Sequence, residues 1–249
     1  MIYGHEKKVS TFKNLADKEK LSHSYLFHGP DGVGKFLFAR SLANYLENGN
    51  FCAEDDSLLD SLIIETEDNS IGLGDLEDNK EFFLKKPFKS STRLVIIDEA
   101  HKLTVHAQSS LLKFVEESPN HTIFVFVSKD PKALLVPLQS RLTNIYFSRL
   151  SLKTVKDFLI NEKGLKSEKA EKIAKQSFGR IGRAINITKE NKKEDDNIEE
   201  FLESKILKIY LDDKISNASK LKKLLQKERE IKRYNTNPKL QKKSIKSII

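Results

Sequence analysis

The sequence predicts an α/β fold in which a parallel sheet is sandwiched by helices and followed by smaller helical units. Two runs, residues 93–97 and 123–127, are almost continuously apolar, which is typical of strands buried on both faces. A glycine-rich loop at residues 29–35 lies between a short apolar strand and an amphipathic helix. Strand and helix signals alternate up to about residue 148, and this alternation indicates a three-layer domain.

Each element of this domain is indicated by its apolar spacing or by a residue that ends it. Val9, Phe12 and Leu15 recur at helical spacing, and Pro87 and Pro119 end two later helices. In chain order we expect helix 2–21, strand 25–28, helix 36–46, strand 62–64, an extended segment at 71–73, a helix of about twelve residues that includes 76–84, strand 93–97, helix 107–115, strand 123–127, a short helix at 131–136 and strand 145–147.

Beyond residue 150 the sequence carries helix signals only. We expect helices over 152–159 and 170–178, a third that begins after Arg183, and two amphipathic faces at 198–209 and 215–231, the second broken at 235–238. The expected domains are an α/β domain at 1–149, a small helical domain at 150–190, a polar linker at 191–197, and a reduced helical segment with a basic tail at 198–249.

Composition excludes several classes of protein and locates the charge. No apolar run approaches the roughly 20 residues that cross a bilayer, and the N-terminus lacks a signal-peptide core, so we expect a cytoplasmic protein without a membrane partner. A single cysteine, Cys52, excludes an intrachain disulfide and a multi-thiolate zinc site. The net charge is +8, and residues 220–249 alone carry eleven Lys or Arg against two Glu. This basic tail fits nucleic acid, an acidic partner or a solvated charge run equally well.

The loop at residues 29–36 carries the first chemical motif. It matches the phosphate loop Gly-x-x-x-x-Gly-Lys-Ser/Thr except at the last position, where Phe36 replaces the hydroxyl. In such loops the backbone N–H groups converge on phosphate oxygens and the lysine reaches the terminal phosphates. The residues expected to bind nucleotide here are Gly29, Gly32, Gly34 and Lys35. Phe36 has no oxygen, so one expected magnesium ligand is missing.

The strand at residues 93–97 ends in the second motif, Asp98 followed by Glu99. A central parallel strand delivers both carboxylates to the sheet edge where the phosphate loop also lies. Asp98 is therefore expected to contact the nucleotide and to hold magnesium, directly or through water, and Glu99 to polarise an attacking water. The alternative is a strand end capped by two solvated acids.

Five stretches in a fixed order resemble the AAA+ clamp-loader family. They are residues 23–27, the loop at 29–35, residues 97–101, residues 111–119, and Ser140 to Leu142. In particular they are similar to the delta-prime subunits of bacterial DNA polymerase III. The resemblance covers residues 1 to about 190. It implies an AAA+ P-loop domain, a helical lid and a collar-like C-terminal domain, which is shortened here.

The resemblance also assigns roles to single residues. Ser128 would stand at the sensor position on its strand. Arg141 would be an arginine finger that acts in trans on a phosphoryl group bound by the adjacent subunit, a role whose removal typically costs a factor of about 10³ or more in rate. The alternative for Arg141 is a helix-capping or surface arginine. Leu142 replaces the family's cysteine.

Three departures from the motor subunits of this family favour the delta-prime role. The hydroxyl is Phe36, the four-cysteine zinc module is absent, and Gly182 stands where the lid arginine is expected, with Arg180 and Arg183 beside it. The implied function is a stationary ring member, with weak or no ATP hydrolysis of its own, within the DNA polymerase III holoenzyme. Its implied partners are the motor and delta subunits, and, through the complex, the sliding clamp and primed DNA. ATP or ADP with magnesium is the implied cofactor, and whether nucleotide is bound stays open. The alternative is an active ATPase motor subunit, gamma/tau-like or replication-factor-C-like.

Overall fold

The computed structural model describes residues 2–53, 58–66, 68–117, 119, 121–190, 206 and 218–233. The expected linker at 191–197, the face at 198–209 apart from Ile206, and the break at 235–238 lie outside the described residues. Of the helices within the described ranges, none is both long enough and apolar enough to cross a membrane.

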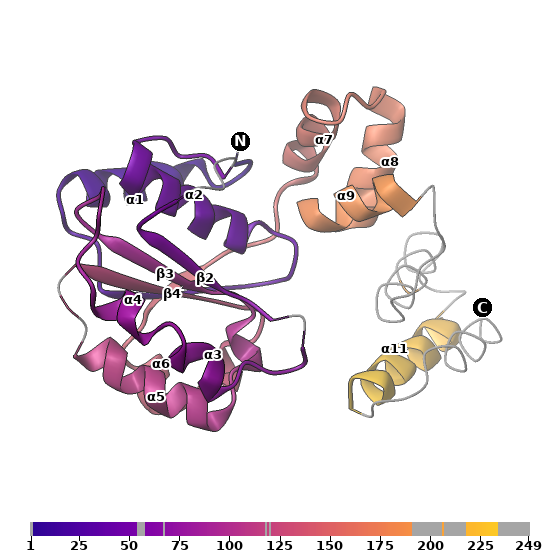
Figure 1. Cartoon of the computed structure of the whole chain (residues 1–249). Helices are drawn as coiled ribbons and strands as arrows, with labels where there is room; N and C mark the ends of the chain where they lie inside the picture. Colours follow the sequence, from indigo (N-terminus) through magenta and orange to yellow (C-terminus); the bar gives the residue numbers. More distant parts are fainter. Residues whose placement is uncertain are drawn as a thin grey trace.

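A five-stranded parallel sheet forms the centre of the first domain (Figure 1). Its strands lie in the order β2-β3-β4-β1-β5, so β1 lies between two strands that follow it late in the chain. Their bounds are β1 Ser24–His28, β2 Ser61–Ile64, β3 Arg93–Ile97, β4 Thr122–Ser128 and β5 Thr143–Tyr146. The α/β fold class expected from the sequence is therefore confirmed.

Helices cover both faces of this sheet (Figure 1). One face packs on α1 (Glu6–Asp17) and α2 (Lys35–Asn48), and the other on α3 (Leu73–Glu77), α4 (Lys80–Leu84), α5 (Val105–Glu116) and α6 (Val136–Gln139). The side chains of each strand alternate between the two cores, because successive residues of a strand point to opposite faces. On β1, Leu26 packs against the α3–α6 side, and Phe27 packs against Phe12 and Phe38 on the α1–α2 side.

Several expected elements are shorter or broken in the structure. The helix expected over residues 2–21 occupies only Glu6–Asp17, and the short helix expected at 131–136 is a 3-10 turn, Pro131–Ala133, followed by α6. The helix expected over 76–84 is two helices, α3 and α4, and Leu73 begins α3. At the break, the Asn79 amide donates to the Asp75 carbonyl at 2.8 Å. A side chain that bonds nearby backbone in this way competes with helix propagation.

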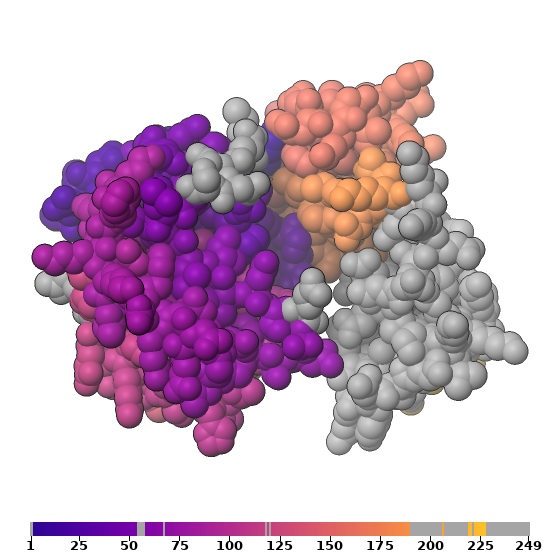
Figure 2. Space-filling model, viewed as in Figure 1, coloured from indigo at the N-terminus to yellow at the C-terminus, as the bar shows by residue number. Residues whose placement is uncertain are grey.

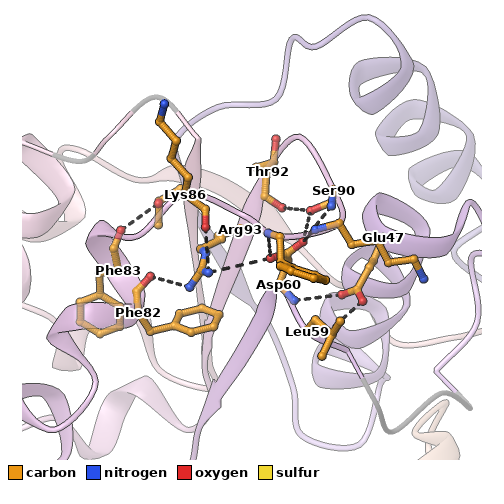
Figure 3. Close-up of polar contacts among 12 residues, drawn as sticks. Glu47, Leu59, Asp60, Phe82, Phe83, Lys86, Ser90, Thr92 and Arg93 are labelled. Atoms are coloured by element: carbon orange, nitrogen blue, oxygen red, sulfur yellow. Dashed lines mark hydrogen bonds and ion pairs between the residues drawn. The ribbon is translucent and has the colours of Figure 1, made fainter.

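A buried carboxylate holds the loop between α4 and β3 (Figure 3). Asp60 is 1% exposed and accepts the backbone N–H groups of Phe88 at 2.5 Å, Lys89 at 2.6 Å and Ser90 at 2.8 Å. Arg93 lies 4.0 Å from the same carboxylate and donates to the Phe82 and Lys86 carbonyls. Burial raises the pKa of Asp60, but the hydrogen bonds from Ser90, Phe88 and Lys89 outweigh it, so the pKa lies below its usual value.

Residues 150–190 form a separate three-helix unit, which we call the lid. It consists of α7 (Leu152–Asn161), α8 (Ser167–Ser177) and α9 (Ile181–Glu190). The lid has its own apolar core, which includes Val155, Leu159 and Ile173, and Figure 2 shows it in orange beside the α/β domain. The third helix begins at Ile181, earlier than the expected start after Arg183. A further helix, α11 (Ala218–Arg233), overlaps the expected face at 215–231, starts three residues later, ends two residues later and buries Leu224.

Candidate functional site

A cavity of about 410 Å³ lies where the carboxyl ends of β3 and β4 meet the loop after β1 and the lid. The loop contributes residues 31–37, β3 is followed by Asp98, Glu99 and His101, and β4 ends at Ser128. In open parallel α/β sheets, ligands bind at this edge of the sheet. The structure therefore brings together Gly32, Gly34, Lys35, Asp98, Glu99 and Ser128, as the sequence predicted, around one cavity.

Gly29 shapes the loop rather than lining the cavity. It has φ +139°, which L side chains rarely adopt, and a Cβ at this position would collide with the carbonyl oxygen of Phe147. Glycine is therefore required for the close approach of two backbones. Gly34 caps the N-terminus of α2, whose first N–H groups have no partner within the helix. That helix end directs positive potential into the cavity.

Lys35 is held inside the loop. Its ammonium donates to the Gly29 carbonyl at 2.7 Å and to the Pro30 carbonyl at 2.8 Å, and lies 3.8 Å from the Asp31 carboxylate. The side chain is 6% exposed. Burial lowers the pKa of Lys35, and the charges of Asp31 and Asp98 oppose that shift. Two of the three N–H donors of the ammonium are therefore used by carbonyls, and the third remains for a phosphate oxygen.

The residues present do not complete a magnesium site. Asp98 accepts the N–H of Glu99 at 2.8 Å, and burial raises the pKa of Asp98, which disfavours the charged form that a metal needs. Phe36 lines the cavity where the hydroxyl ligand is expected. Among the described residues, no three His, Cys, Asp or Glu side chains gather to hold a metal ion.

Glu99 and Ser128 both line the cavity, and each already has a protein partner. Glu99 has a left-handed backbone, with φ +47°, and its carboxylate lies 2.7 Å from the Lys102 ammonium. Ser128 donates to the Asp130 carbonyl at 2.8 Å and accepts the Asp130 N–H at 3.1 Å, so its hydroxyl closes the turn after β4. The Ser128 hydroxyl proton is therefore used within the turn, whereas the Glu99 carboxylate keeps acceptor sites that the ion pair does not occupy.

The lid contacts the phosphate loop through backbone atoms. The N–H of Gly182 donates to the Gly32 carbonyl at 2.8 Å, and a Cβ on Gly182 would lie 2.9 Å from the Gly32 Cα. The lid residues that line the cavity are Phe158, Ile181, Gly182 and Ile185, so Arg180 and Arg183 are not among them. Glycine at position 182 thus allows this close contact, and the lid wall of the cavity is apolar.

The N-terminal segment forms a wall of the cavity that sequence reasoning missed. Ile2, Tyr3 and His5 line it, and His5 Nε2 donates to the Val33 carbonyl at 2.8 Å. Burial lowers the pKa of His5, which favours the neutral ring. Tyr3 donates to Glu162 of the lid at 2.8 Å. These residues carry no motif, and only the packing of α1 brings them to the loop.

Arg141 lies at the opposite edge of the sheet from the cavity. Its backbone carbonyl accepts the hydroxyl of Ser24, the first residue of β1, at 2.8 Å. The other end of β1, His28, leads into the phosphate loop and lies about 13 Å from Ser24 along the strand. The guanidinium is 41% exposed, pairs with Glu116 at the end of α5, and donates to the Pro137 carbonyl at 2.8 Å. Arg141 is therefore placed outside the chain's own cavity.

Comparison with known proteins agrees with the motifs. The family model described as "DNA polymerase III, delta subunit" matches residues 4–151. The delta' subunit of DNA polymerase III from Bacillus subtilis is 30% identical over 211 residues, which cover 79% of this chain and 61% of that protein. The gamma/tau subunit from Mycobacterium tuberculosis is 31% identical over 172 residues, 64% of this chain and 30% of that protein. The gamma/tau subunit from Mycoplasma pneumoniae is 29% identical, and this chain covers 22% of it. The chain thus spans less than two thirds of the length of these relatives.

Solved structures share the fold. The DNA polymerase III gamma subunit-related protein of Thermotoga maritima has a TM-score of 0.59 at 18% identity, covering 96% of this chain and 97% of that chain. The RuvB Holliday junction branch migration motor of the same organism has a TM-score of 0.56 at 22% identity, covering 74% of this chain and 59% of that one. The assignment to a family rests on the family model, which matches residues 4–151 and so more than half of the chain. The chain belongs to the DNA polymerase III delta subunit family, among the AAA+ clamp-loader proteins.

Proposed function

We propose that this chain is a delta-prime-like subunit of the replicative clamp loader. In this role it helps to load the sliding clamp on primed DNA and donates Arg141 to the nucleotide site of a neighbouring ATPase subunit. Its own ATP hydrolysis is weak or absent. Its partners are the motor and delta subunits in the cytoplasm, and it belongs to the DNA polymerase III holoenzyme through them.

The position of Arg141 carries this proposal. The side chain is half-exposed at the sheet edge opposite the cavity, so a phosphoryl group that it contacts must belong to another subunit. The cavity of the chain itself lacks the hydroxyl and the lid arginine, since Phe36 and Gly182 occupy those positions. A chain that keeps the arginine but lacks both groups fits a subunit that donates an arginine finger better than it fits an ATP-hydrolysing motor subunit.

Assembly is the first test of this proposal. The full chain should co-purify with the motor and delta subunits of its own organism, and the resulting complex should load the clamp on primed DNA. Omission of this chain should abolish loading. If the chain forms no complex with those subunits, the proposal is wrong, and a generic assembly adaptor becomes the better account.

Arg141→Ala tests the finger itself in the assembled complex. We expect DNA-stimulated ATP hydrolysis to fall by a factor of about 10³, with assembly unchanged, because the finger stabilises transition-state charge. Glu116→Gln is the matched control, since it removes the same intrachain ion pair while leaving the guanidinium in place. If Glu116→Gln reproduces the defect, or if Arg141→Ala hydrolyses ATP normally, Arg141 is a structural surface arginine.

An active motor subunit remains the second candidate. The observation in its favour is that Lys35, Asp98 and Glu99 line the same cavity, as hydrolysis in this chain would require. In that case another group completes the metal shell in place of the hydroxyl that Phe36 lacks. ATP turnover by the isolated chain separates the two candidates.

A further inference from the structure

Lys129 is a positively charged residue that lines the cavity and belongs to none of the sequence motifs. It directly follows Ser128 at the carboxyl end of β4, is exposed, and lines the cavity with Lys35 and His101. Within the part of the chain that the structure describes, its ammonium makes no hydrogen bond and no ion pair. Lys35, by comparison, is held by two carbonyls and Asp31.

Lys129 lies close enough to Lys35 and His101 to disfavour the charged forms of both. The charge of Lys129 lowers the pKa values of both Lys35 and His101, in addition to the larger effect of burial. Nδ1 of His101 is buried without a hydrogen-bond partner among the described residues. An anion bound between these groups would relieve the repulsion and pair with the Lys129 ammonium.

The acids of the cavity do not neutralise Lys129. Glu99 pairs with Lys102, Asp31 lies beside Lys35, and Asp98 accepts the N–H of Glu99. The carboxylates therefore have other partners. Among the described residues, the unpaired positive charge of the cavity is on Lys129, directly after the end of β4, whereas the lid contributes apolar residues.

Two groups that usually neutralise nucleotide phosphates are absent from their expected positions. Phe36 offers magnesium no oxygen, and Gly182 leaves no room for an arginine, because its Cβ position already meets the Gly32 backbone. We propose that Lys129 is a second phosphate-binding residue that supplies this missing positive charge, so that the chain holds a nucleoside polyphosphate without a divalent cation. The inference rests on the expectation, from its motif, that the loop at residues 29–36 holds nucleotide.

Direct binding of ADP and ATP to the purified full chain tests the inference, with calorimetry in EDTA and in excess Mg²⁺. We expect the wild-type affinity to be the same within about twofold in the two buffers. Lys129→Ala should weaken binding about 10- to 100-fold, because a charge-assisted hydrogen bond to phosphate is lost. Lys129→Arg should restore it. Because Lys129 is exposed, these variants should keep the wild-type melting temperature.

Lys132→Ala and Lys35→Ala are the controls. Lys132 is an exposed lysine of the same loop that does not line the cavity, so its removal should leave affinity unchanged. Loss of Lys35 should abolish binding. Wild-type affinity in Lys129→Ala, or wild-type binding that requires Mg²⁺, overturns the inference. A wild-type chain that binds neither nucleotide also overturns it. None of these results alters the assembly or the Arg141 test, so the clamp-loader proposal fails or stands separately.

Discussion

Two single residues, Asp60 and Gly182, each support a quantitative prediction. Asp60 is a buried carboxylate that serves a loop rather than the nucleotide cavity. Gly182 is a glycine whose missing side chain sets the distance between two domains. Both positions affect stability first, and Gly182 also determines the shape of the cavity.

Asp60→Asn should lower the free energy of unfolding by about 2–4 kcal/mol, because it removes a charged acceptor and leaves Arg93 buried beside a neutral amide. The pKa of Asp60 is lower in the folded chain than its unfolded value of about 3.9, so the charge stabilises the fold above that pH. This contribution is lost as the pH falls through the folded pKa. Urea unfolding at pH 7 and at decreasing pH should therefore show the variant approach the wild type. Exposed Asp78→Asn is the control, and equal pH profiles for wild type and Asp60→Asn would count against the assignment.

Gly182→Ala should open the contact between lid and phosphate loop. The added Cβ would lie 2.9 Å from the Gly32 Cα, a distance that requires backbone movement, and overpacking of this kind costs about 1–3 kcal/mol. Hydrogen exchange at the Gly182 amide, which bonds the Gly32 carbonyl, should accelerate. Gly74→Ala, where a Cβ meets nothing within 4 Å, should be neutral or stabilising. Unchanged exchange in Gly182→Ala would show that the contact is not maintained in solution.

The start of the lid is fixed by an N-cap and by one backbone hydrogen bond next to it. Ser151 is the N-cap of α7, and its hydroxyl accepts the Thr154 N–H at 3.0 Å. The residue before it, Leu150, donates its N–H to the Gly179 carbonyl at 2.8 Å and so joins the start of α7 to the end of α8. One cap therefore stabilises the point at which the lid leaves the sheet.

Ser151→Ala should destabilise the chain by about 1 kcal/mol, because the N–H of Thr154 loses its acceptor. Ser151→Asp keeps an acceptor oxygen at the cap and should retain most of the stability. Urea unfolding followed by circular dichroism measures both. Equal losses in the two variants would mean that α7 does not depend on this cap.

At the scale of the whole molecule, the chain carries a nucleotide cavity at one sheet edge and Arg141 at the other. We expect the isolated chain to hydrolyse ATP no faster than buffer, and Glu99→Gln to change nothing, because Glu99 is paired with Lys102 and the metal shell is incomplete. Phosphate release measured with the purified chain tests this. Clear turnover that Glu99→Gln abolishes would establish the motor alternative.

The sequence was informative wherever the signal is local. The parallel sheet followed from continuous apolar runs, and the shared cavity of Lys35, Asp98 and Ser128 followed from motifs that lie at the ends of strands. Helix lengths were less predictable. Competition from the Asn79 side chain divided one helix in two, because a single side-chain bond to the backbone does not alter the apolar spacing.

The sequence by itself thus determined the fold class, the family motifs and the absence of a hydroxyl at Phe36, since each depends on neighbouring residues along the chain. Only the tertiary structure decided that His5 donates to the phosphate loop, that the backbone of Gly182 contacts Gly32, and that Lys129 lines the cavity with no partner among the described residues. These contacts join residues that are distant in sequence, and their geometry depends on how the domains pack. No spacing rule along the chain contains that information.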